Sequence, residues 1–469
     1  MTHVRELDAP PAVLRRLAAG QPERYPVLLE SVAPGPLGRV SLLLGLPRAA
    51  LWLDRESCLG ASPGVPCEGG FLDSLEQWWL AERAALPIDT VTDVPFTGGW
   101  AVFLGYEIAQ EIEPRLELPA AAQPWRAFAL RTPCALAHIP GTHRVLAIAE
   151  PGAERELAEL QRDVEEAACA EPRVENGPER ALSFSVREEE PERHLERVRR
   201  AKEYIRAGDI YQANLSRPWE AVALGSGGAH AAVSPALTAG DLYARLAAAN
   251  PAPFAALAQW GGVSVVSSSP ERLIRVSGRD VETRPIAGTR PRTRRPGVDA
   301  EEAAALIAHP KERAEHIMLI DLERNDLGRV CEAGSVCVDE LMATETYAHV
   351  HHIVSNVRGR LRPDVTPVGA MRAVFPGGTI TGVPKFRCMQ IIAELEGAGR
   401  GAYTGALGYL TASGALDLNI LIRTLTMSEG RIAFRAGGGI VADSDPEREL
   451  EETRAKARGL LAALGSSSR

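Results

Sequence analysis

The chain has 469 residues, 45% of them apolar, and a formal net charge of −9 from 52 basic and 61 acidic side chains. This length predicts two or three domains with a large core, and the negative charge argues against a general nucleic-acid surface. Seven cysteines are scattered without a CxxC pair. No apolar run approaches the roughly 20 residues that span a bilayer. We therefore expect a cytoplasmic protein with reduced thiols that binds neither membrane nor nucleic acid.

The first part of the chain mixes strand-like and helical segments. Apolar runs typical of strands are SLLLGL (41–46), AVFLGYE (101–107) and RVLAIAE (144–150). Residues 152–195 are rich in Glu, Ala, Arg and Pro and predict a helix, an acidic connector and a second helix. This composition places a boundary between an N-terminal region, 1–180, and a second region, 190–469.

The second part continues the mixture with longer elements. Its strand-like runs are GVSVVSSS (262–269), RLIRVSG (272–278) and RIAFRAGGGIVA (431–442), and long helical segments separate them. The order lacks the regular strand–helix repeat of a barrel, so it predicts a mixed α+β or α/β architecture.

The segment TRPIAGTRPR (283–292) places three arginines and a glycine around a small apolar centre. Such a segment suits an anionic ligand, but it contains no Cys, His, Lys or acid that could react with one. The basic cluster at 290–295 is compatible with either a solvated loop or an anion pocket.

A predicted helix follows at HPKERAEHIMLIDLERNDLG (309–328), where Pro310 suits the first turn. Glu315 is followed at i+3, i+4 and i+7 by Met318, Leu319 and Leu322, so its carboxylate shares a face with apolar groups. A charge on a buried face must be paired or must bind a metal. A salt bridge to Arg or Lys and a metal site therefore both remain open.

A second acidic helix is predicted in GGGIVADSDPERELEETRAK (437–456), after a strand that ends in three glycines. Ser444 or Asp445 can cap this helix at its N-terminus. Glu449, Glu452 and Lys456 recur on one face. They form either a surface pair of Glu452 with Lys456, or two Mg²⁺ ligands and a lysine that binds a ligand carboxylate.

Two further segments carry polar groups. YAHVHHIVSNVRG (347–359) reads as a strand, in which alternation sends His351 and His352 to opposite faces. FPGGTITGVPK (375–385) reads as a Gly/Thr/Pro loop before a helix. Its backbone and Thr379 could hold a carboxylate or a hydroxyl, and it lacks the spacing of a nucleotide-binding P-loop.

Together these segments resemble the chorismate-utilising enzymes, in the family's order. The matching blocks are SSSPERL (267–273), RPIAGTRPR (284–292), 309–329, HVHHIVSNV (349–357), 375–385, GAYTGALGYL (401–410), IRT (422–424) and GGGIVADSDPERELEE (437–452). YPVLLES (25–31) and FTGGWAVFLGYE (96–107) extend the resemblance to the N-terminal region. It implies an anthranilate synthase component I-like α+β fold of two intertwined subdomains, with large antiparallel sheets packed face to face and helices outside.

The resemblance also implies residue roles on a chorismate substrate. Glu315 and Glu452 would bind Mg²⁺, with Glu449 reaching it through water. His352 and Glu271 would assist departure of the C4 hydroxyl. The residues implied around the substrate are Thr379, Tyr403, Arg423, Gly438, Gly439, Lys456, Ala287, Gly288 and Thr289.

The residue that bears on the choice of nucleophile is Gln212 in DIYQANLSR. Members of the family that add water carry a lysine base at the corresponding position. Glutamine is no base at neutral pH, whereas ammonia needs none, so the resemblance favours amination. Ammonia would come from a separate glutamine amidotransferase subunit, because this chain has no matching Cys-His-Glu set.

The regiochemistry rests on conflicting residues. Ala287 and the LLES segment resemble the tryptophan branch, where the amine enters at C2. Asn214 in YQANLSR and the segment LDLNILIRT (416–424) resemble the folate branch, where it enters at C4. We expect the C4 product. A possible tryptophan pocket would be lined by Leu29, Glu30, Ser31, Pro253 and Phe254.

Overall fold

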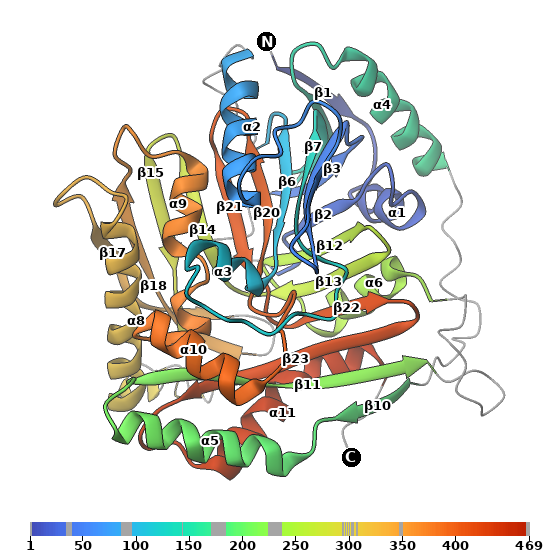
Figure 1. The fold of residues 1–469 in the computed structure, drawn as a ribbon. Coiled ribbons are helices and arrows are strands. Elements are labelled where there is room, and N and C mark those ends of the chain that lie inside the picture. The colour runs from blue at the N-terminus through green and yellow to red at the C-terminus, as the bar shows by residue number, and fades with distance from the viewer. Residues whose placement is uncertain are drawn as a thin grey trace.

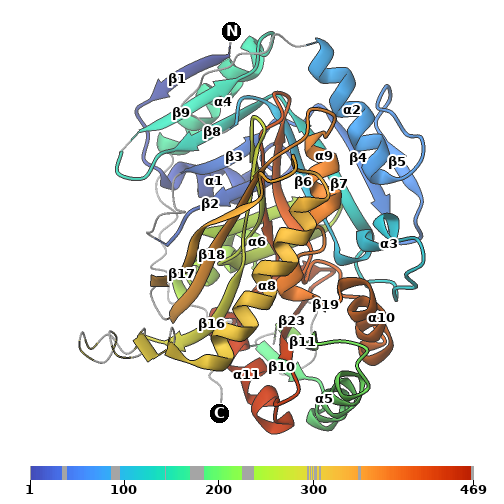
Figure 2. The ribbon, with the colours of Figure 1, turned by 90° about the vertical axis from the view of Figure 1, so that its left-hand side faces the viewer.

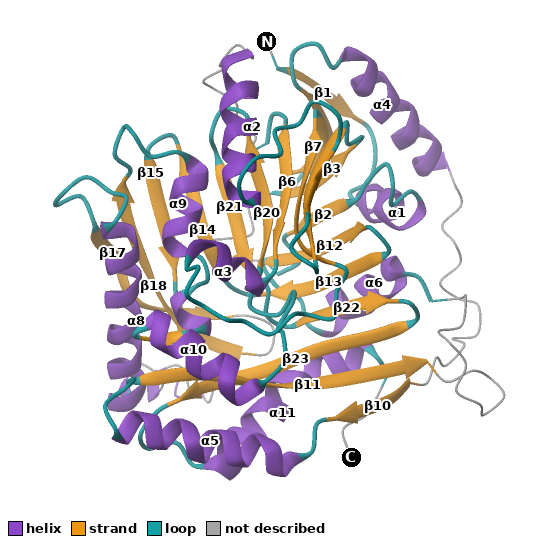
Figure 3. Cartoon of the chain, viewed as in Figure 1, coloured by secondary structure: helices purple, strands orange, loops and turns teal. Residues whose placement is uncertain are grey.

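The protein is described here from a computed structural model that covers residues 2–33, 40–85, 96–142, 144–169, 184–223, 237–346 and 350–465, apart from scattered positions between 293 and 307. Two large antiparallel sheets form its centre and helices lie outside them (Figure 1, Figure 3). This arrangement confirms the predicted α+β class. Within the described residues, no helix combines the length and apolar character needed to cross a bilayer.

The first sheet has twelve described strands and runs through both parts of the chain. Its order is β1-β9-β8-β3-β2-β12-β13-β22-β23-β11-β10, and β19 pairs with β11. The strand bounds are β1 (His3–Leu7), β9 (Val145–Ala149), β8 (Cys134–His138), β3 (Ser41–Gly45), β2 (Val27–Glu30), β12 (Phe254–Trp260), β13 (Val263–Ser269), β22 (Thr424–Ser428), β23 (Arg431–Ile440), β11 (Gln212–Ala223), β10 (Phe184–Glu188) and β19 (Gly382–Val383).

The second sheet has eleven described strands in the order β16-β18-β15-β14-β21-β20-β6-β7-β4-β5, and β17 pairs with β18. The bounds are β16 (Ile286–Pro291), β18 (Val350–Arg360), β15 (Asp280–Arg284), β14 (Arg272–Ser277), β21 (Leu416–Ile420), β20 (Ala406–Thr411), β6 (Gly99–Leu104), β7 (Trp125–Thr132), β4 (Ala49–Asp54), β5 (Leu59–Ala61) and β17 (Cys337–Thr346). Both sheets therefore combine strands from 1–180 and from 190–469, which intertwines the two regions.

The helices cover the outer faces of the sheets (Figure 2). Their bounds are α1 (Ala12–Gly20), α2 (Phe71–Ala85), α3 (Ala109–Ile112), α4 (Glu154–Cys169), α5 (Pro191–Arg206), α6 (Ala239–Ala249), α8 (Pro310–Gly328), α9 (Pro367–Val374), α10 (Lys385–Glu396) and α11 (Pro446–Ala463), with short 3-10 turns η1 (Tyr106–Ile108) and η2 (Gly378–Ile380). The predicted acidic connector lies mostly in 170–183, outside the described residues.

Strand alternation builds the core between the sheets. On β6, Phe103 points inward to the space between the sheets, while Val102 faces the outer layer of helices. On β3, Leu42 points inward and Leu43 faces outward. Because successive side chains of a strand point to opposite faces, each sheet buries one apolar face against the other sheet and one against helices.

Two local predictions about the acidic helix can be checked. Asp445 is the residue that caps α11, since its carboxylate accepts the Arg448 N–H at 3.0 Å. The prediction that the preceding strand ends at the glycines is wrong, because β23 continues to Ile440. The reason is β11, which pairs Leu215 with Gly438 and Asn214 with Gly439 and so extends the ladder.

Candidate active site

The glycine segment of β23 lies directly under the acidic face of α11. A Cβ placed on Gly438 would lie 3.0 Å from Glu452 Oε1 and 3.5 Å from both Glu449 Oε2 and Lys456 Nζ. Glycine is therefore the residue that leaves room above the strand. The predicted helix face, with Glu449, Glu452 and Lys456 at i, i+3 and i+7, is brought together at one point.

Lys456 and Glu452 form the ion pair that their spacing predicts, and both remain next to Gly438. Lys456 Nζ lies 2.7 Å from Glu452 Oε1 and donates a hydrogen bond to the Gly437 carbonyl at 2.9 Å. Glu449 is buried, whereas the Glu452 side chain is about half exposed at 48%. Two carboxylates and one ammonium group thus line the space that Gly438 leaves.

Gln212 and Tyr403 lie next to the two neighbouring glycines, whose Cβ positions face the side of the strand opposite to that of Gly438. A Cβ on Gly439 would overlap the Gln212 amide, and one on Gly437 would lie 2.8 Å from the Tyr403 hydroxyl. Gln212 is buried, and its Oε1 has no hydrogen-bond partner among the described residues. The predicted substrate-binding glycines therefore lie between an uncharged amide, a phenol and the acidic helix.

Glu271, which follows β13, is buried close to the η2 loop. Its Oε1 accepts the Ile286 N–H at 3.3 Å. Burial raises the pKa of this carboxyl to about 7, against the opposing effects of the neighbouring Thr379 hydroxyl, the Ile286 N–H and the Arg423 charge. Glu271 therefore holds a proton over much of the neutral range, as a group that protonates a leaving hydroxyl must.

His352 on β18 is buried and lies near the same charges. Its Nδ1 is 3.4 Å from the Gly288 carbonyl. Burial, together with the Arg423 and Lys456 charges, lowers the pKa of His352 to about 3. A neutral imidazole that donates from Nδ1 presents Nε2 as an acceptor, so this histidine accepts rather than supplies a proton.

The strand that carries Ala287, Gly288 and Thr289 bends at its glycine. The register of β16 with β18 pairs Ala287 with Ile353 and Thr289 with His352, and it shifts between these pairs. Gly288 has a φ of 64°, a value that suits the extra residue of a bulge. This bulge turns the Gly288 carbonyl to His352.

The two arginines of TRPIAGTRPR whose side chains the structure describes, Arg284 and Arg292, are both paired with acids. Arg284 lies 2.6 Å from both Glu340 and Glu345, and Arg292 lies 3.2 Å from Asp299. The charge of Arg284 is thus balanced by acids distant in sequence, and that of Arg292 by an acid seven residues away. The side chain of Arg290 lies outside the described residues.

Arg423 occupies the turn between β21 and β22 with a φ of 52°. Its carbonyl accepts the Ser268 N–H at 3.1 Å, which ties the turn to β13. Its guanidinium charge acts on both Glu271 and His352. Arg423 is therefore placed between the two groups predicted to handle the leaving hydroxyl.

Glu315 lies on α8, which packs against β16 and β18. It is half-buried, and the next residue, His316, bonds the Ser355 hydroxyl of β18 at 2.6 Å. In the part of the chain that the structure describes, no three His, Cys, Asp or Glu side chains already form a metal cluster. The predicted set of Glu315, Glu449 and Glu452 stays a prediction.

The possible tryptophan pocket residues lie at the adjacent ends of β2 and β12, where Glu30 pairs with Ala255. The Ser31 hydroxyl donates to the Pro253 carbonyl at 3.1 Å, and Leu29 is partly buried against the core between the sheets. Glu30 binds Arg15 at 2.8 Å and the Tyr243 hydroxyl at 2.6 Å. The ring of Phe254 lies 5.1 Å from the Arg272 guanidinium carbon.

Sequence reasoning missed a buried ionic network below the site. Glu396 binds Arg400 at 2.6 Å and Arg435 at 2.7 Å. Arg400 also donates to the Asn214 and Ile380 carbonyls. Burial alone would raise the pKa of Glu396, but the two arginines outweigh it and lower this pKa to about 2. The i,i+4 spacing of Glu396 and Arg400 is the available sequence signal, and it resembles an ordinary surface pair.

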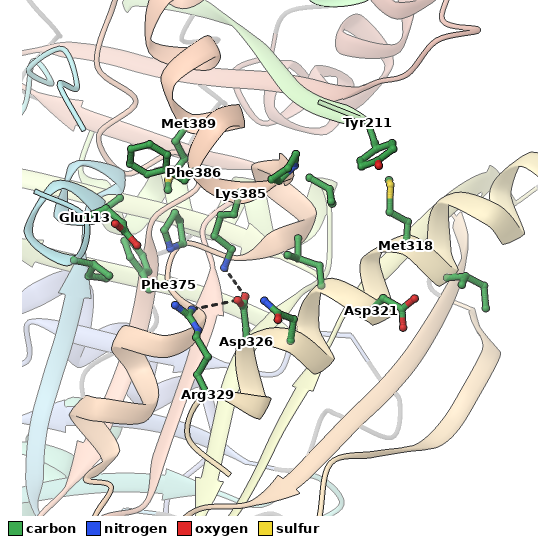
Figure 4. Close-up of a pocket in the computed structure, with 18 of the residues that line it drawn as sticks. Glu113, Tyr211, Met318, Asp321, Asp326, Arg329, Phe375, Lys385, Phe386 and Met389 are labelled. Atoms are coloured by element: carbon green, nitrogen blue, oxygen red, sulfur yellow. Dashed lines mark hydrogen bonds and ion pairs between the residues drawn. The ribbon is translucent and has the colours of Figure 1, made fainter. Parts of the chain in front are cut away.

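A cavity of about 670 Å³ lies between α8 and α10, and we call it the α8–α10 cavity (Figure 4). Figure 4 shows Asp326 between Lys385 and Arg329 at its wall, with ion-pair distances of 2.5 and 3.2 Å. The residues implied for chorismate are not among those lining this cavity.

Comparisons with known proteins identify the family of this chain. The model of the chorismate binding enzyme family matches residues 68–462, and the chain belongs to that family. An anthranilate synthase component I-like protein of Synechocystis is 40% identical over 93% of this chain and 86% of its own length. An aminodeoxychorismate synthase of Streptomyces griseus is 38% identical over 94% of this chain, which spans only 61% of that relative.

Solved structures show the same fold. Anthranilate synthase component I from Streptococcus pneumoniae aligns with a TM-score of 0.77 and 29% identity over 91% of this chain and 93% of its own. The menaquinone-specific isochorismate synthase from Escherichia coli aligns with a TM-score of 0.69 and 17% identity over 99% and 95% of the two chains. The expected anthranilate synthase component I-like architecture is confirmed.

Proposed function

We propose that this chain is an aminodeoxychorismate synthase component I, which replaces the C4 hydroxyl of chorismate with an amino group for 4-aminobenzoate and folate synthesis. The observation that carries the proposal is Gln212, an uncharged amide buried against Gly439 where the family's hydrating members need a base. An amide cannot deprotonate water at neutral pH, whereas ammonia attacks with its own lone pair.

The donor set fits Mg²⁺, which commonly uses one or two carboxylates and retains several waters. Glu449 and Glu452 converge on the space above Gly438, and Glu315 of α8 would complete the set. Bound Mg²⁺ would hold the ring carboxylate of chorismate and make the hydroxyl a better leaving group. Lys456 and Arg423 would balance the substrate's negative charge, and Tyr403 and Thr379 would donate hydrogen bonds to it.

Glu271 and His352 handle the proton. As the C–N bond forms and the C–O bond breaks, the protonated Glu271 gives its proton to the departing oxygen, so water leaves. The product ammonium group then returns a proton to Glu271. His352 stays neutral and orients the hydroxyl by accepting its hydrogen bond at Nε2. Neutral His352 is consistent with a pKa of about 3.

Asn214 supports the C4 product. Its Nδ2 donates to the Thr379 carbonyl at 3.3 Å, so the residue that resembles the folate branch contacts the substrate loop. A separate glutamine amidotransferase subunit would supply the ammonia, as the "component I" in several relatives' names suggests.

A second candidate is anthranilate synthase component I, in which chorismate yields anthranilate and pyruvate. Ala287 favours it, because the folate-branch pattern has a lysine there and this strand position pairs with Ile353 beside the His352 bulge. Relatives of both kinds match this chain at similar identity, for example 38% for Thermus thermophilus anthranilate synthase component 1.

Product analysis distinguishes the two candidates. The purified chain is incubated with chorismate, Mg²⁺ and ¹⁵N-ammonium, with and without a 4-aminobenzoate-forming lyase. We expect a labelled amino adduct that becomes 4-aminobenzoate only when the lyase is added. Labelled anthranilate with pyruvate in the absence of lyase would assign the chain to the tryptophan branch, and unlabelled isochorismate would refute amination.

A further inference from the structure

Glu323 of α8 is a buried carboxyl that the proposed mechanism does not use. Only 4% of its surface is exposed, and its Oε1 accepts the Gly378 N–H at 3.3 Å. A Cβ on Gly378 would lie 3.2 Å from that oxygen and would overlap Leu322. The helix therefore presses closely on the η2 loop, and the loop can bind Glu323 only through a glycine.

The contact continues into the site through the next residue. Thr379 follows Gly378 directly and its hydroxyl neighbours the Glu271 carboxyl. The Thr379 carbonyl also accepts the Asn214 amide. A shift of Gly378 would consequently move both the loop's hydroxyl and its carbonyl relative to the substrate.

The charge of Glu323 reaches Glu271 as well. Burial is the main cause of the raised pKa of Glu271, and Glu323 raises it further when it is ionised. Burial and the Asp326 charge raise the pKa of Glu323 itself to about 7. The groups that face Glu323 are Asp326 on its own helix, Lys385 on α10, Thr283 on β15 and the Gly378 N–H. Those that face Glu271 besides Glu323 are Arg423, Thr379 and the Ile286 N–H.

We propose that Glu323 is a positioning residue for the Glu271–Thr379 pair. Glu323 holds the η2 loop through Gly378, and its carboxylate keeps the proton on Glu271. This inference rests on the proposed function, since it assigns Glu271 the proton of the leaving hydroxyl. Two like-charged carboxyls in one buried region resist simultaneous ionisation, so removal of one charge eases ionisation of the other.

The kinetic test compares Glu323→Gln, Glu323→Ala and the control Asp321→Asn in chorismate consumption from about pH 6 to 9. Glutamine keeps an acceptor for Gly378 but removes the charge. In Glu323→Gln we expect the decline of kcat with rising pH to begin about 0.5 to 1 pH unit lower than in the parent. At a pH above this decline, kcat should be roughly threefold to tenfold lower than in the parent. Glu323→Ala should also raise KM. The carboxylate of Asp321 is exposed, with 63% of the side chain accessible, so Asp321→Asn should match the parent.

A uniform loss of kcat in Glu323→Gln, without movement of the pH limb, would mean a merely structural role and would overturn the inference. A second readout is independent of turnover. The infrared C=O band that Glu271→Gln abolishes should disappear at lower pH in Glu323→Gln than in the parent, and an unchanged midpoint would overturn the inference. Failure of the proposed function would appear instead in the product's identity, which neither measurement depends on.

Discussion

Gln212 on β11 fills the space above Gly439 on β23, so that a single methyl group on that glycine would overlap the glutamine amide. The register that pairs Asn214 with Gly439 sets this contact. The glutamine side chain can lie over the strand only where the strand has no side chain of its own, so Gly439 permits the position of Gln212 on which the proposed choice of nucleophile rests.

Replacement of the glutamine should change the nucleophile. In Gln212→Lys, burial would lower the pKa of the new amine, which could then act as a base on water. We expect ammonia-dependent turnover to fall at least tenfold and a water adduct of unchanged mass, isochorismate, to appear in the chromatogram. Absence of that adduct, with normal amination, would contradict the role given to Gln212.

The acidic face of α11 supplies a metal test with a matched control. Glu452→Gln should abolish Mg²⁺-dependent turnover, because it removes a carboxylate at the point where Glu449 and Lys456 converge. Glu451→Gln changes the adjacent residue, whose side chain is 68% exposed and pairs with Arg454, and should leave turnover near the parent value. Titration with Mg²⁺ measures both variants, and equal Mg²⁺ dependence in the two would refute the assignment.

The pH dependence should follow Glu271. Its raised pKa of about 7 means that the proton is present below this pH and is lost above it. Because Glu271 must donate a proton, we expect kcat to decline as pH rises through about 7, which gives the pH profile an alkaline limb. His352 is neutral throughout this range and adds no limb of its own. Glu271→Gln should lower kcat by about 10²- to 10⁴-fold and remove the limb. An unchanged alkaline limb in this variant would assign the limb to another group.

The ionic network below the site predicts a large stability effect. Glu396→Gln leaves Arg400 and Arg435 buried without their carboxylate, and loss of one partner of a buried pair costs about 3–5 kcal/mol. The exposed pair of Glu394 with Arg200 is the control, since loss of a surface pair costs about 1 kcal/mol or less. Urea unfolding of Glu396→Gln and Glu394→Gln measures the difference, and similar midpoints would contradict the account.

Local patterns predicted what depends on neighbours in sequence. Apolar runs identified the strands β3 and β6, proline marked the start of α8, and the i, i+3, i+7 spacing on α11 put Glu449, Glu452 and Lys456 on one face. Roles such as those of Glu271 and His352 came from the family resemblance rather than from spacing, and the structure puts both beside Arg423.

Contacts between distant segments were not predictable in the same way. Arg284 pairs with Glu340 and Glu345, acids that the local pattern of TRPIAGTRPR does not include, and the ladder with β11 extends β23 past its glycines. The contact of Glu323 with Gly378 joins residues 55 positions apart, and no local pattern marks it. Such contacts depend on how the sheets pack, which period and composition do not specify.

The most direct measurement is a crystal structure with Mg²⁺ and a non-reacting chorismate analogue. We predict a metal bound by Glu315 and Glu452, with Glu449 reaching it through water. The ring carboxylate would lie on that metal above Gly438, and the ring hydroxyl beside His352 and Glu271. An analogue bound instead in the α8–α10 cavity, or a metal held away from both Glu315 and Glu452, would contradict this prediction.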